Sequence, residues 1–333
     1  MKILVKIKAV FRKLRYIMWD LIHFSGLANR HYKQSKGCRI LLYHGVCSQD
    51  PTRFNTLFVT KEAFENHLKF YKKYFNVVSL EDFYAGRFAT DRFNICLTLD
   101  DGFANNYHYV LPLLVKYQIP ATFFITAIQA SGYSILWNDL LALAGTYGPE
   151  KFSFQNEDYY KNRHGKYYTI DGKSLITKLR SSGFNLKAAL IDQLWPLLDI
   201  EKMDEQKEYW IQMREEQIQS LSASPYALIG SHGYYHNDLS QTDLQDATKE
   251  IVLSKQYLEN LIGKEITSFA FPYGSYHGES LKAAKNAGYK MILATDFLNK
   301  EDHNDDFMKE RLTINPFIST ANQLFAIIKG NYA

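Results

Sequence analysis

Short apolar runs alternate with amphipathic stretches along most of the chain. The apolar runs have the length of strands, and we predict strands at 38–43, 76–79, 94–99, 121–126, 227–230, from Phe269 onward, and at 289–294. Apolar positions at helical spacing predict helices at 61–73, 105–117, 244–261 and 278–288. Short strands that alternate with helices of this length indicate βα units. We therefore expect an α/β barrel, whose chemistry gathers at the C-terminal ends of its strands.

The alternation stops between residues 137 and 225. This stretch is polar and rich in tyrosine near 159–168, and it contains predicted helices at 186–197 and 204–221. Because it follows the C-terminal end of a strand, we expect an insertion on the active-site face of the barrel. A lid or wall of the substrate groove and a decoration packed on the barrel side remain equal alternatives. We thus divide the chain into an N-terminal segment, 1–36, and a barrel domain, 37–333, with insertion 137–225.

The N-terminal segment differs from the rest in charge. Residues 1–36 contain nine basic residues and one acidic residue, so the remainder of the chain carries a net charge of −4. Apolar residues recur at helical spacing from Ile3 to Ile22, but charges interrupt them too often for a membrane span. We predict a basic amphipathic helix with peripheral membrane contact through residues 1–24. The alternative is a helix whose apolar face closes the bottom of the barrel.

Composition narrows the class of protein. With 333 residues, 46% of them hydrophobic, the chain can build one large core. Its three cysteines, Cys38, Cys47 and Cys96, have no metal-binding spacing, which favours a reducing compartment over a disulfide framework. Residues 1–36 have neither the continuous apolar core nor the cleavage site of a signal peptide. We expect a cytoplasmic protein, peripheral at the inner face of the membrane, with no nucleic acid partner.

Two motifs indicate chemistry. Asp100 and Asp101 follow an apolar run, and His232 and His236 lie four residues apart after another. Alone, Asp-Asp-Gly is typical of a turn, and His-x3-His of two solvated helix positions. Together, two imidazoles and one carboxylate form the ligand set of a catalytic metal site with open positions. The second carboxylate can take a proton from the metal's water, which predicts metal-assisted hydrolysis.

The motif Thr98-Leu99-Asp100-Asp101-Gly102 and the segment Ser231–His236 resemble motifs of the polysaccharide deacetylases, carbohydrate esterase family four. The resemblance implies a distorted (β/α) barrel in which Asp100 is the general base. It also implies one divalent metal ion, expected to be zinc, on Asp101, His232 and His236.

The segment Phe271-Pro272-Tyr273-Gly274 resembles the third motif of the family. The resemblance implies that the backbone N–H of Tyr273 helps to hold the oxyanion. We expect Pro272 and Tyr235 to contribute to substrate binding.

The chain departs from the family pattern in three ways. Gly233 stands where the family has Ser or Thr, and no arginine precedes Pro272. The Leu-x-His motif of the last strand is absent near the C-terminus, but Leu42-Tyr43-His44 stands at the end of the first predicted strand. This order resembles the circularly permuted branch, similar to poly-N-acetylglucosamine deacetylases, and implies that His44 is the general acid. The alternative for His44 is a turn histidine.

The implied function is removal of an acetyl group, most often N-acetyl, from a sugar or polysaccharide precursor in surface glycan assembly. The expected partner is therefore an acetylated sugar or glycan. Two alternatives remain. A non-catalytic carbohydrate-binding protein of the same fold would lose its metal ligands first. A metal-independent glycosidase would use paired carboxylates and resist chelators.

Overall fold

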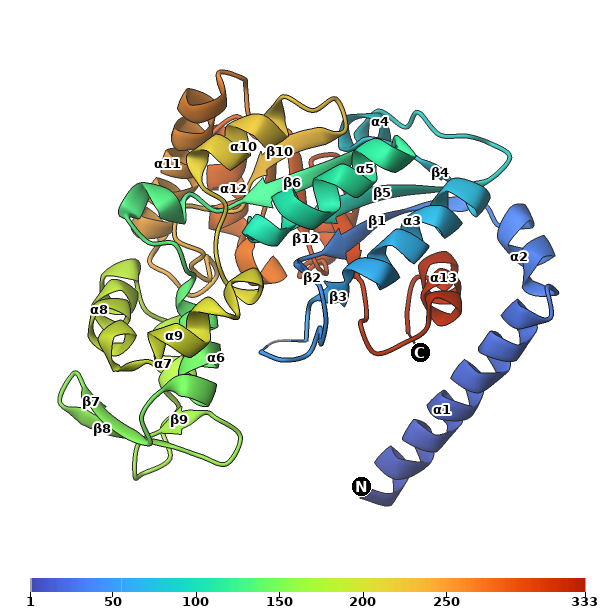
Figure 1. Cartoon of the computed structure of the whole chain (residues 1–333). Helices are drawn as coiled ribbons and strands as arrows, with labels where there is room; N and C mark the ends of the chain where they lie inside the picture. The colour runs from blue at the N-terminus through green and yellow to red at the C-terminus, as the bar shows by residue number, and fades with distance from the viewer. Residues whose placement is uncertain (1, 55, 333) are drawn as a thin grey trace.

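Parallel strands form the centre of the computed structural model, which describes residues 2–54 and 56–332 (Figure 1). The strands are β1 (Gly37–Tyr43), β2 (Val46–Cys47), β3 (Val59–Thr60), β4 (Phe75–Val77), β5 (Phe93–Leu99), β6 (Ala121–Ile125), β7 (Lys151–Phe154), β8 (Glu157–Lys161), β9 (Tyr167–Tyr168), β10 (Ala227–Ser231), β11 (Ser268–Ala270), β12 (Met291–Ala294) and β13 (Met308–Thr313).

The helices surround this sheet. They are α1 (Lys2–Phe24), α2 (Ala28–Gln34), α3 (Lys61–Tyr74), α4 (Leu80–Tyr84), α5 (Leu111–Tyr117), α6 (Trp137–Tyr147), α7 (Leu175–Arg180), α8 (Phe184–Leu194), α9 (Ile200–Asp204), α10 (Glu215–Ser222), α11 (Leu244–Ile262), α12 (Gly278–Asn286) and α13 (Thr320–Lys329). Shorter helical turns are η1 (Asn106–Val110), η2 (Ile128–Ser131), η3 (Trp195–Leu197), η4 (Lys207–Tyr209), η5 (Pro272–Gly274) and η6 (Lys300–Asn304).

Seven parallel strands close into a barrel, which confirms the predicted fold class. They follow the order β1-β13-β12-β11-β10-β6-β5, and β5 pairs back with β1 over its whole length. β4 pairs with the N-terminal half of β5, outside the ring. Every residue of β5 is buried, as expected for a strand covered on both faces. Because all seven strands run in the same direction, their C-terminal ends meet at one face.

The strand that closes the barrel was not predicted. β13 reads Met-Lys-Glu-Arg-Leu-Thr, and its charges conceal the usual apolar signal of a buried strand. It pairs in parallel with both β1 and β12, and Arg311 lies opposite Ile40 in this register. This pairing places the charged side chain of Arg311 in the barrel wall.

The insertion has its own apolar core. Its helices α6 to α9 and the antiparallel sheet β7-β8-β9 pack around buried side chains such as Trp137 and Leu140. The predicted helix at 204–221 forms only in part: α9 ends at Asp204, η4 is a short helical turn, and α10 begins at Glu215. In the segment between η4 and α10, the carbonyl oxygen of Ile211 accepts the backbone N–H of Ala104, and the backbone N–H of Met213 donates to the carbonyl oxygen of Gly102. These bonds to the loop after β5 hold the chain extended and override its helical pattern.

The N-terminal region lies outside the barrel, with α1 projecting along one side (Figure 1). It continues through a turn at Gly26 into α2, which leads to β1. Across residues 2–54 and 56–332, no helix combines the length and apolar character needed to cross a bilayer. The division into N-terminal segment, barrel and insertion stays a prediction about folding units.

Candidate active site

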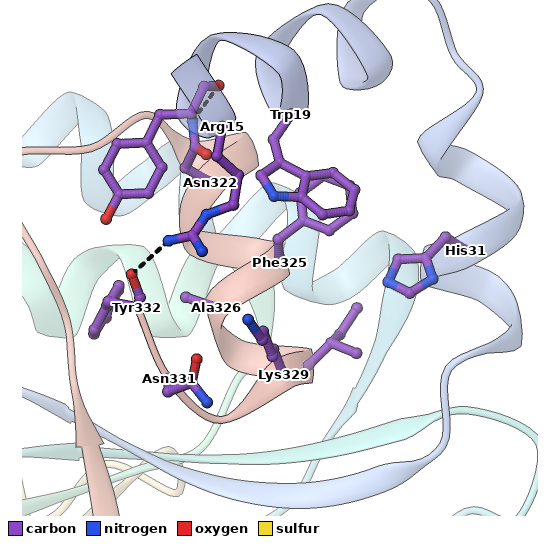
Figure 2. A pocket seen from close by; sticks show the side chains of 11 residues that line it. Arg15, Trp19, His31, Asn322, Phe325, Ala326, Lys329, Asn331 and Tyr332 are labelled. Atoms are coloured by element: carbon purple, nitrogen blue, oxygen red, sulfur yellow. Dashed lines mark hydrogen bonds between the residues drawn. The ribbon is translucent and has the colours of Figure 1, made fainter. Parts of the chain in front are cut away.

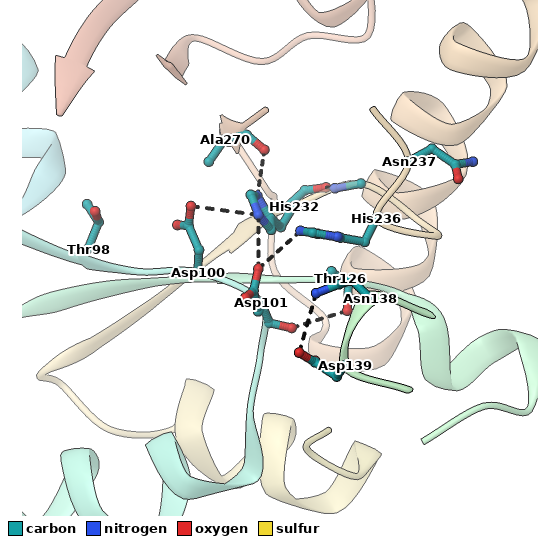
Figure 3. A network of polar contacts seen from close by, with 12 residues as sticks. Thr98, Asp100, Asp101, Thr126, Asn138, Asp139, His232, His236, Asn237 and Ala270 are labelled. Atoms are coloured by element: carbon teal, nitrogen blue, oxygen red, sulfur yellow. Dashed lines mark hydrogen bonds and ion pairs between the residues drawn. The ribbon is translucent and has the colours of Figure 1, made fainter. Parts of the chain in front are cut away.

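The strand ends bring the predicted site residues together (Figure 3). Asp100 and Asp101 follow β5, and His232 follows β10. Backbone bonds continue the strand pairing into these residues, because the N–H of Asp100 donates to Tyr43 at 3.0 Å and that of His232 donates to Ile125 at 2.9 Å. The strand pairing of the barrel wall therefore fixes the backbone positions of Asp100 and His232.

Three of these side chains form a compact ligand set. One ligand atom from each of Asp101, His232 and His236 lies within 4.8 Å of the others, and all three residues are buried. The Oδ1 atom of Asp101 lies 3.4 Å from Nε2 of His232 and 3.2 Å from Nε2 of His236. Bonds of about 2.0–2.1 Å to a tetrahedral zinc ion would separate neighbouring ligand atoms by about 3.3 Å. The triad thus has the spacing that a small divalent cation requires.

Hydrogen bonding prepares His232 for this role. Its Nδ1 atom lies 2.8 Å from the carbonyl oxygen of Ala270 and donates to it, so in the neutral ring the lone pair of Nε2, which faces Asp101, is free to bind a cation. Asp101 and His236 adopt positive φ angles of 75° and 58°. Residues other than glycine rarely adopt this conformation, and it clusters at functional sites where the surroundings enforce it.

Asp100 is held by an arginine that the sequence analysis missed. Arg311 donates from Nη1 to Oδ1 and from Nη2 to Oδ2 of Asp100, both at 2.7 Å. Arg311 is buried and also donates to the Thr98 hydroxyl at 3.3 Å. A planar guanidinium that binds both carboxylate oxygens fixes their orientation. Asp100 is therefore oriented by an arginine of β13, although no arginine precedes Pro272.

The charges around Asp100 favour its ionised form. Burial opposes ionisation, but the Arg311 guanidinium and His232 outweigh burial and hold the pKa of Asp100 below its usual value. Asp101 is likewise buried, and its bonds with His232 and His236 hold its pKa well below the usual range. The surroundings of both carboxylates thus favour their anionic forms.

His44 faces the same cluster from the end of β1. Burial lowers its pKa, and the negative charges of Asp101 and Asp100 oppose that effect. Its Nδ1 atom is buried and makes no hydrogen bond within the part of the chain that the structure describes. β1 lies between β13 and β5 in the closed barrel, which places His44 beside Asp100 although the two are far apart in sequence.

The third motif forms the tight turn η5. Tyr273 has a φ angle of 60°, and its ring lies 4.7 Å from that of His236. Gly274 is required here, because a Cβ atom would lie 2.1 Å from the Thr295 hydroxyl. Pro272 is buried in the same turn. The turn therefore holds Tyr273 against His236.

Tyr235 is directed elsewhere. Its ring stacks on the ring of Phe184 in α8, with the ring centroids 4.0 Å apart, so Tyr235 contacts the insertion. A role in substrate binding for Tyr235 stays a prediction.

The glycine in the histidine motif also has a structural reason. Gly233 has a φ angle of 78°, and a Cβ atom there would lie 2.9 Å from Oε1 of Glu250. The Glu250 carboxylate accepts backbone N–H groups from Tyr235 at 3.0 Å and Asn237 at 3.2 Å. This buried carboxylate braces the loop, so no hydroxyl at position 233 is needed.

The insertion reaches the site directly. Trp137 donates its indole N–H to the carbonyl oxygen of His236 at 3.3 Å. The Arg180 guanidinium lies 4.7 Å above the Tyr273 ring and donates to Asp238 at 2.7 Å. These contacts place α6 and α7 beside the triad of Asp101, His232 and His236.

Comparisons with known proteins agree with this geometry. The family model for "Polysaccharide deacetylase" matches residues 89–187 and 204–292, more than half of the chain. Among curated proteins, "Putative polysaccharide deacetylase YxkH" of Bacillus subtilis (strain 168) is 31% identical over 84 residues, 25% of this chain. The match spans only 30% of the length of that relative.

Solved structures share the fold. The Streptococcus pyogenes deacetylase PplD, in complex with acetate, has a TM-score of 0.56 at 18% identity, covering 88% of this chain and 99% of its own. IcaB from Ammonifex degensii has a TM-score of 0.55 at 17% identity, covering 89% and 98%. From the family match and the shared barrel, we conclude that the chain belongs to the polysaccharide deacetylase family.

Proposed function

We propose that the protein is a metal-dependent hydrolase that removes an acetyl group, most often N-acetyl, from a glycan. The observation that carries the proposal is the pairing of two carboxylates with separate tasks. Asp101 shares a ligand cluster with two histidines, whereas Asp100 is held 2.7 Å from both Nη atoms of Arg311. A ligand set with open positions next to an oriented, ionised base is the arrangement that hydrolysis needs.

The residues divide the work as follows. A divalent cation on the triad, zinc in our proposal, would polarise the acetyl carbonyl and make a bound water more acidic. Asp100, ionised and fixed by Arg311, accepts the proton of the attacking water. The backbone N–H of Tyr273 stabilises the charge that develops on the carbonyl oxygen.

His44 completes the reaction as the proton donor. An amide nitrogen is a poor leaving group until it is protonated, so a donor must face the departing amine. His44 lies among Asp100, Asp101 and Arg311 and can occupy that place. Because burial lowers its pKa, we expect the donor form to predominate only on the acidic side of its usual pKa. We further propose that this early position of the histidine reflects a circular permutation of the family pattern.

A direct test is acetate release from a panel of N- and O-acetylated sugars and oligosaccharides, with and without chelator. The proposal predicts release that stops with chelator and returns with added zinc. Chelator-resistant cleavage of a glycosidic bond would instead support the glycosidase alternative. Metal binding with no acetate released from any member of the panel would favour the non-catalytic alternative.

A second part of the proposal concerns where the enzyme works. We propose that α1 contacts an anionic membrane surface, so that the substrate is a membrane-proximal glycan of the surface-assembly pathway. One face of α1 is attached to the body of the protein (Figure 2). Trp19 packs on Phe325 with ring centroids 3.7 Å apart, and Arg15 donates to the carbonyl oxygen of Tyr332 at 3.0 Å.

The other face of α1 supports a lipid partner. Large apolar side chains on this face and the following turn are exposed: Phe11 by 69%, Leu14 by 57%, Ile17 by 48%, Met18 by 46%, Leu21 by 65%, Phe24 by 82% and Leu27 by 73%. The face that docks on α13 is therefore not this apolar face, contrary to the alternative of an apolar cap. Burying the exposed parts of these side chains in lipid would contribute about 7–13 kcal/mol, at about 1.5–3 kcal/mol for each complete burial.

Charge selects the kind of membrane. The basic excess of residues 1–36 favours anionic lipid by about 1 kcal/mol for each lysine or arginine near the surface. The same charge disfavours a second copy of this helix as the occupant. We therefore expect α1 to lie in the plane of the interface.

Vesicle sedimentation of the full chain tests this part. We expect binding to vesicles of phosphatidylglycerol and phosphatidylcholine that falls at least tenfold in Leu14→Ser/Leu21→Ser. The control Ile170→Ser, at a position 91% exposed in the insertion, should bind like the parent. Equal binding by the double variant, or no binding by the parent, would refute membrane contact and leave the chemistry untouched.

A further inference from the structure

Three buried polar atoms beside the metal ligands have no hydrogen-bond partner in the part of the chain that the structure describes. They are Oδ2 of Asp139, Oδ1 of Asn138 and the hydroxyl oxygen of Tyr273. Buried polar groups in folded proteins almost always have a partner, and one without it costs stability. Three such atoms in one region indicate that something outside the chain completes their bonding.

The position of these atoms ties them to the active site. Asn138 and Asp139 begin α6, directly after Trp137, whose indole N–H is bonded to His236. The Trp137 ring lies 6.5 Å from the Tyr273 ring, which in turn lies 4.7 Å from His236. Figure 3 shows Asn138 and Asp139 next to Asp101, on the side of the triad where the insertion packs.

The chemistry of the group argues against a second metal ion. Within the described residues, Asp101, His232 and His236 form the one cluster of three or more ligand atoms close enough to share an ion. Asp139 is not part of it. Its one hydrogen bond is a long one, 3.3 Å, from the neighbouring Asn138 amide. Asp139 is 6% exposed, and burial together with the charge of Asp101 raises its pKa well above the usual value.

A neutral ligand rich in hydroxyl groups suits such a set. A protonated carboxyl and a phenol can each donate and accept, and an amide oxygen accepts. Sugar hydroxyls also donate and accept, so they can satisfy all three atoms without bringing a charge next to Asp101.

We propose that Asn138, Asp139 and the Tyr273 hydroxyl form a subsite that hydrogen-bonds the ring hydroxyls of the sugar that carries the acetyl group. This proposal rests on the proposed deacetylase function and deepens it. It gives α6 of the insertion a defined role: it positions the sugar, while the barrel residues carry out the chemistry. Asp139 is thus a positioning residue for the acetyl group above the metal ligands.

The test compares binding and chemistry in the full chain loaded with zinc. The probe is triacetylchitotriose, titrated calorimetrically into Asp100→Asn so that no turnover occurs. In this background we expect Asp139→Ala to weaken the affinity about tenfold, because two hydrogen bonds are lost. Asn138→Ala and Tyr273→Phe should each give a smaller loss. The matched control is Asp158→Ala, which removes an exposed carboxylate of the β7–β8 hairpin and should leave the affinity unchanged.

A second readout separates the subsite from the proposed function. With Asp100 intact, hydrolysis of p-nitrophenyl acetate, which has no sugar, should be the same in Asp139→Ala as in the parent, and zinc content should be equal. Unchanged triacetylchitotriose affinity in Asp139→Ala, or no binding by the parent, would overturn the subsite. Loss of ester hydrolysis or zinc in Asp139→Ala would also overturn it, because Asp139 would then act on the metal centre. Absence of both ester and amide hydrolysis in the parent would instead refute the proposed function, while the binding result would still decide the subsite.

Discussion

Replacing Arg311 by lysine should move the pH dependence of the reaction. Arg311 is buried and binds both oxygens of Asp100 at 2.7 Å, and lysine keeps the charge but loses this paired geometry. Burial alone would raise the pKa of Asp100, and the arginine is the largest opposing influence. In Arg311→Lys the pKa of Asp100 should therefore rise, and the ionised base should be lost at a higher pH than in the parent. At pH 5 we expect the ratio of variant to parent kcat/KM to be at least tenfold lower than at pH 8.

Replacing Arg311 should also lower the free energy of unfolding. Removing one partner of a buried ion pair typically costs about 3–5 kcal/mol, which we expect for Arg311→Met, with a smaller loss for lysine. Since the folded-state pKa of Asp100 is depressed, its stabilising contribution is complete above the unfolded value of about 3.9 and is lost as the pH falls through the folded value. The destabilisation should therefore be largest at neutral pH, shrink as the pH falls through the raised pKa of Asp100 in the variant, and shrink further below about pH 4. It can be measured by urea unfolding at several pH values.

The assay requires one control. The metal content of Arg311→Lys must equal that of the parent, so that a rate change reports on the base and not on the cation. If the variant with full metal content shows the parent's acidic limb, Arg311 does not set the ionisation of Asp100 and our reasoning fails.

Three further predictions concern single side chains. Asp100→Asn should retain the metal ion but lose nearly all turnover; acetate release and metal analysis check this, and full activity would exclude Asp100 as the base. His44→Ala should slow amide hydrolysis more than hydrolysis of an activated ester, whereas equal losses on both substrates would count against a proton donor. Asp139→Asn should stabilise the protein at neutral pH by about 1.4 kcal/mol for each unit by which the folded-state pKa of Asp139 is raised, because the amide needs no proton to stay neutral when buried. Thermal unfolding should show this gain increasing as the pH rises above about 4 and absent below it, and a gain that does not vary with pH would contradict the stated cause.

The sequence predicted the barrel because its strands are short, apolar and separated by helices. The same reasoning missed β13, where Lys309, Glu310 and Arg311 interrupt the apolar pattern. Arg311 is buried only because Asp100 neutralises it, and that partner lies more than 200 residues away. Pattern analysis considers neighbours in sequence, so it could note that an arginine was missing without finding its replacement.

The sequence also predicted only part of the candidate site. Asp101, His232 and His236 were found because metal ligands have a recognisable chemistry and each follows a predicted strand. Asp139 carried no such signal, since a single acidic residue near the start of a helix is ordinary. Only the folded arrangement shows that one of its oxygens is buried without a partner beside the ligands. The extended segment at 210–214 was missed for a related reason, because distant backbone partners decide its conformation.

The most direct measurement is a zinc-edge anomalous difference map from crystals of the parent and of His236→Ala grown with zinc. We predict one strong peak per chain in the parent, between Oδ1 of Asp101 and the Nε2 atoms of His232 and His236, and a lost or greatly weakened peak in the variant. A parent map with no peak there, or an equally strong peak in His236→Ala, would contradict the metal centre on which the proposed hydrolysis depends.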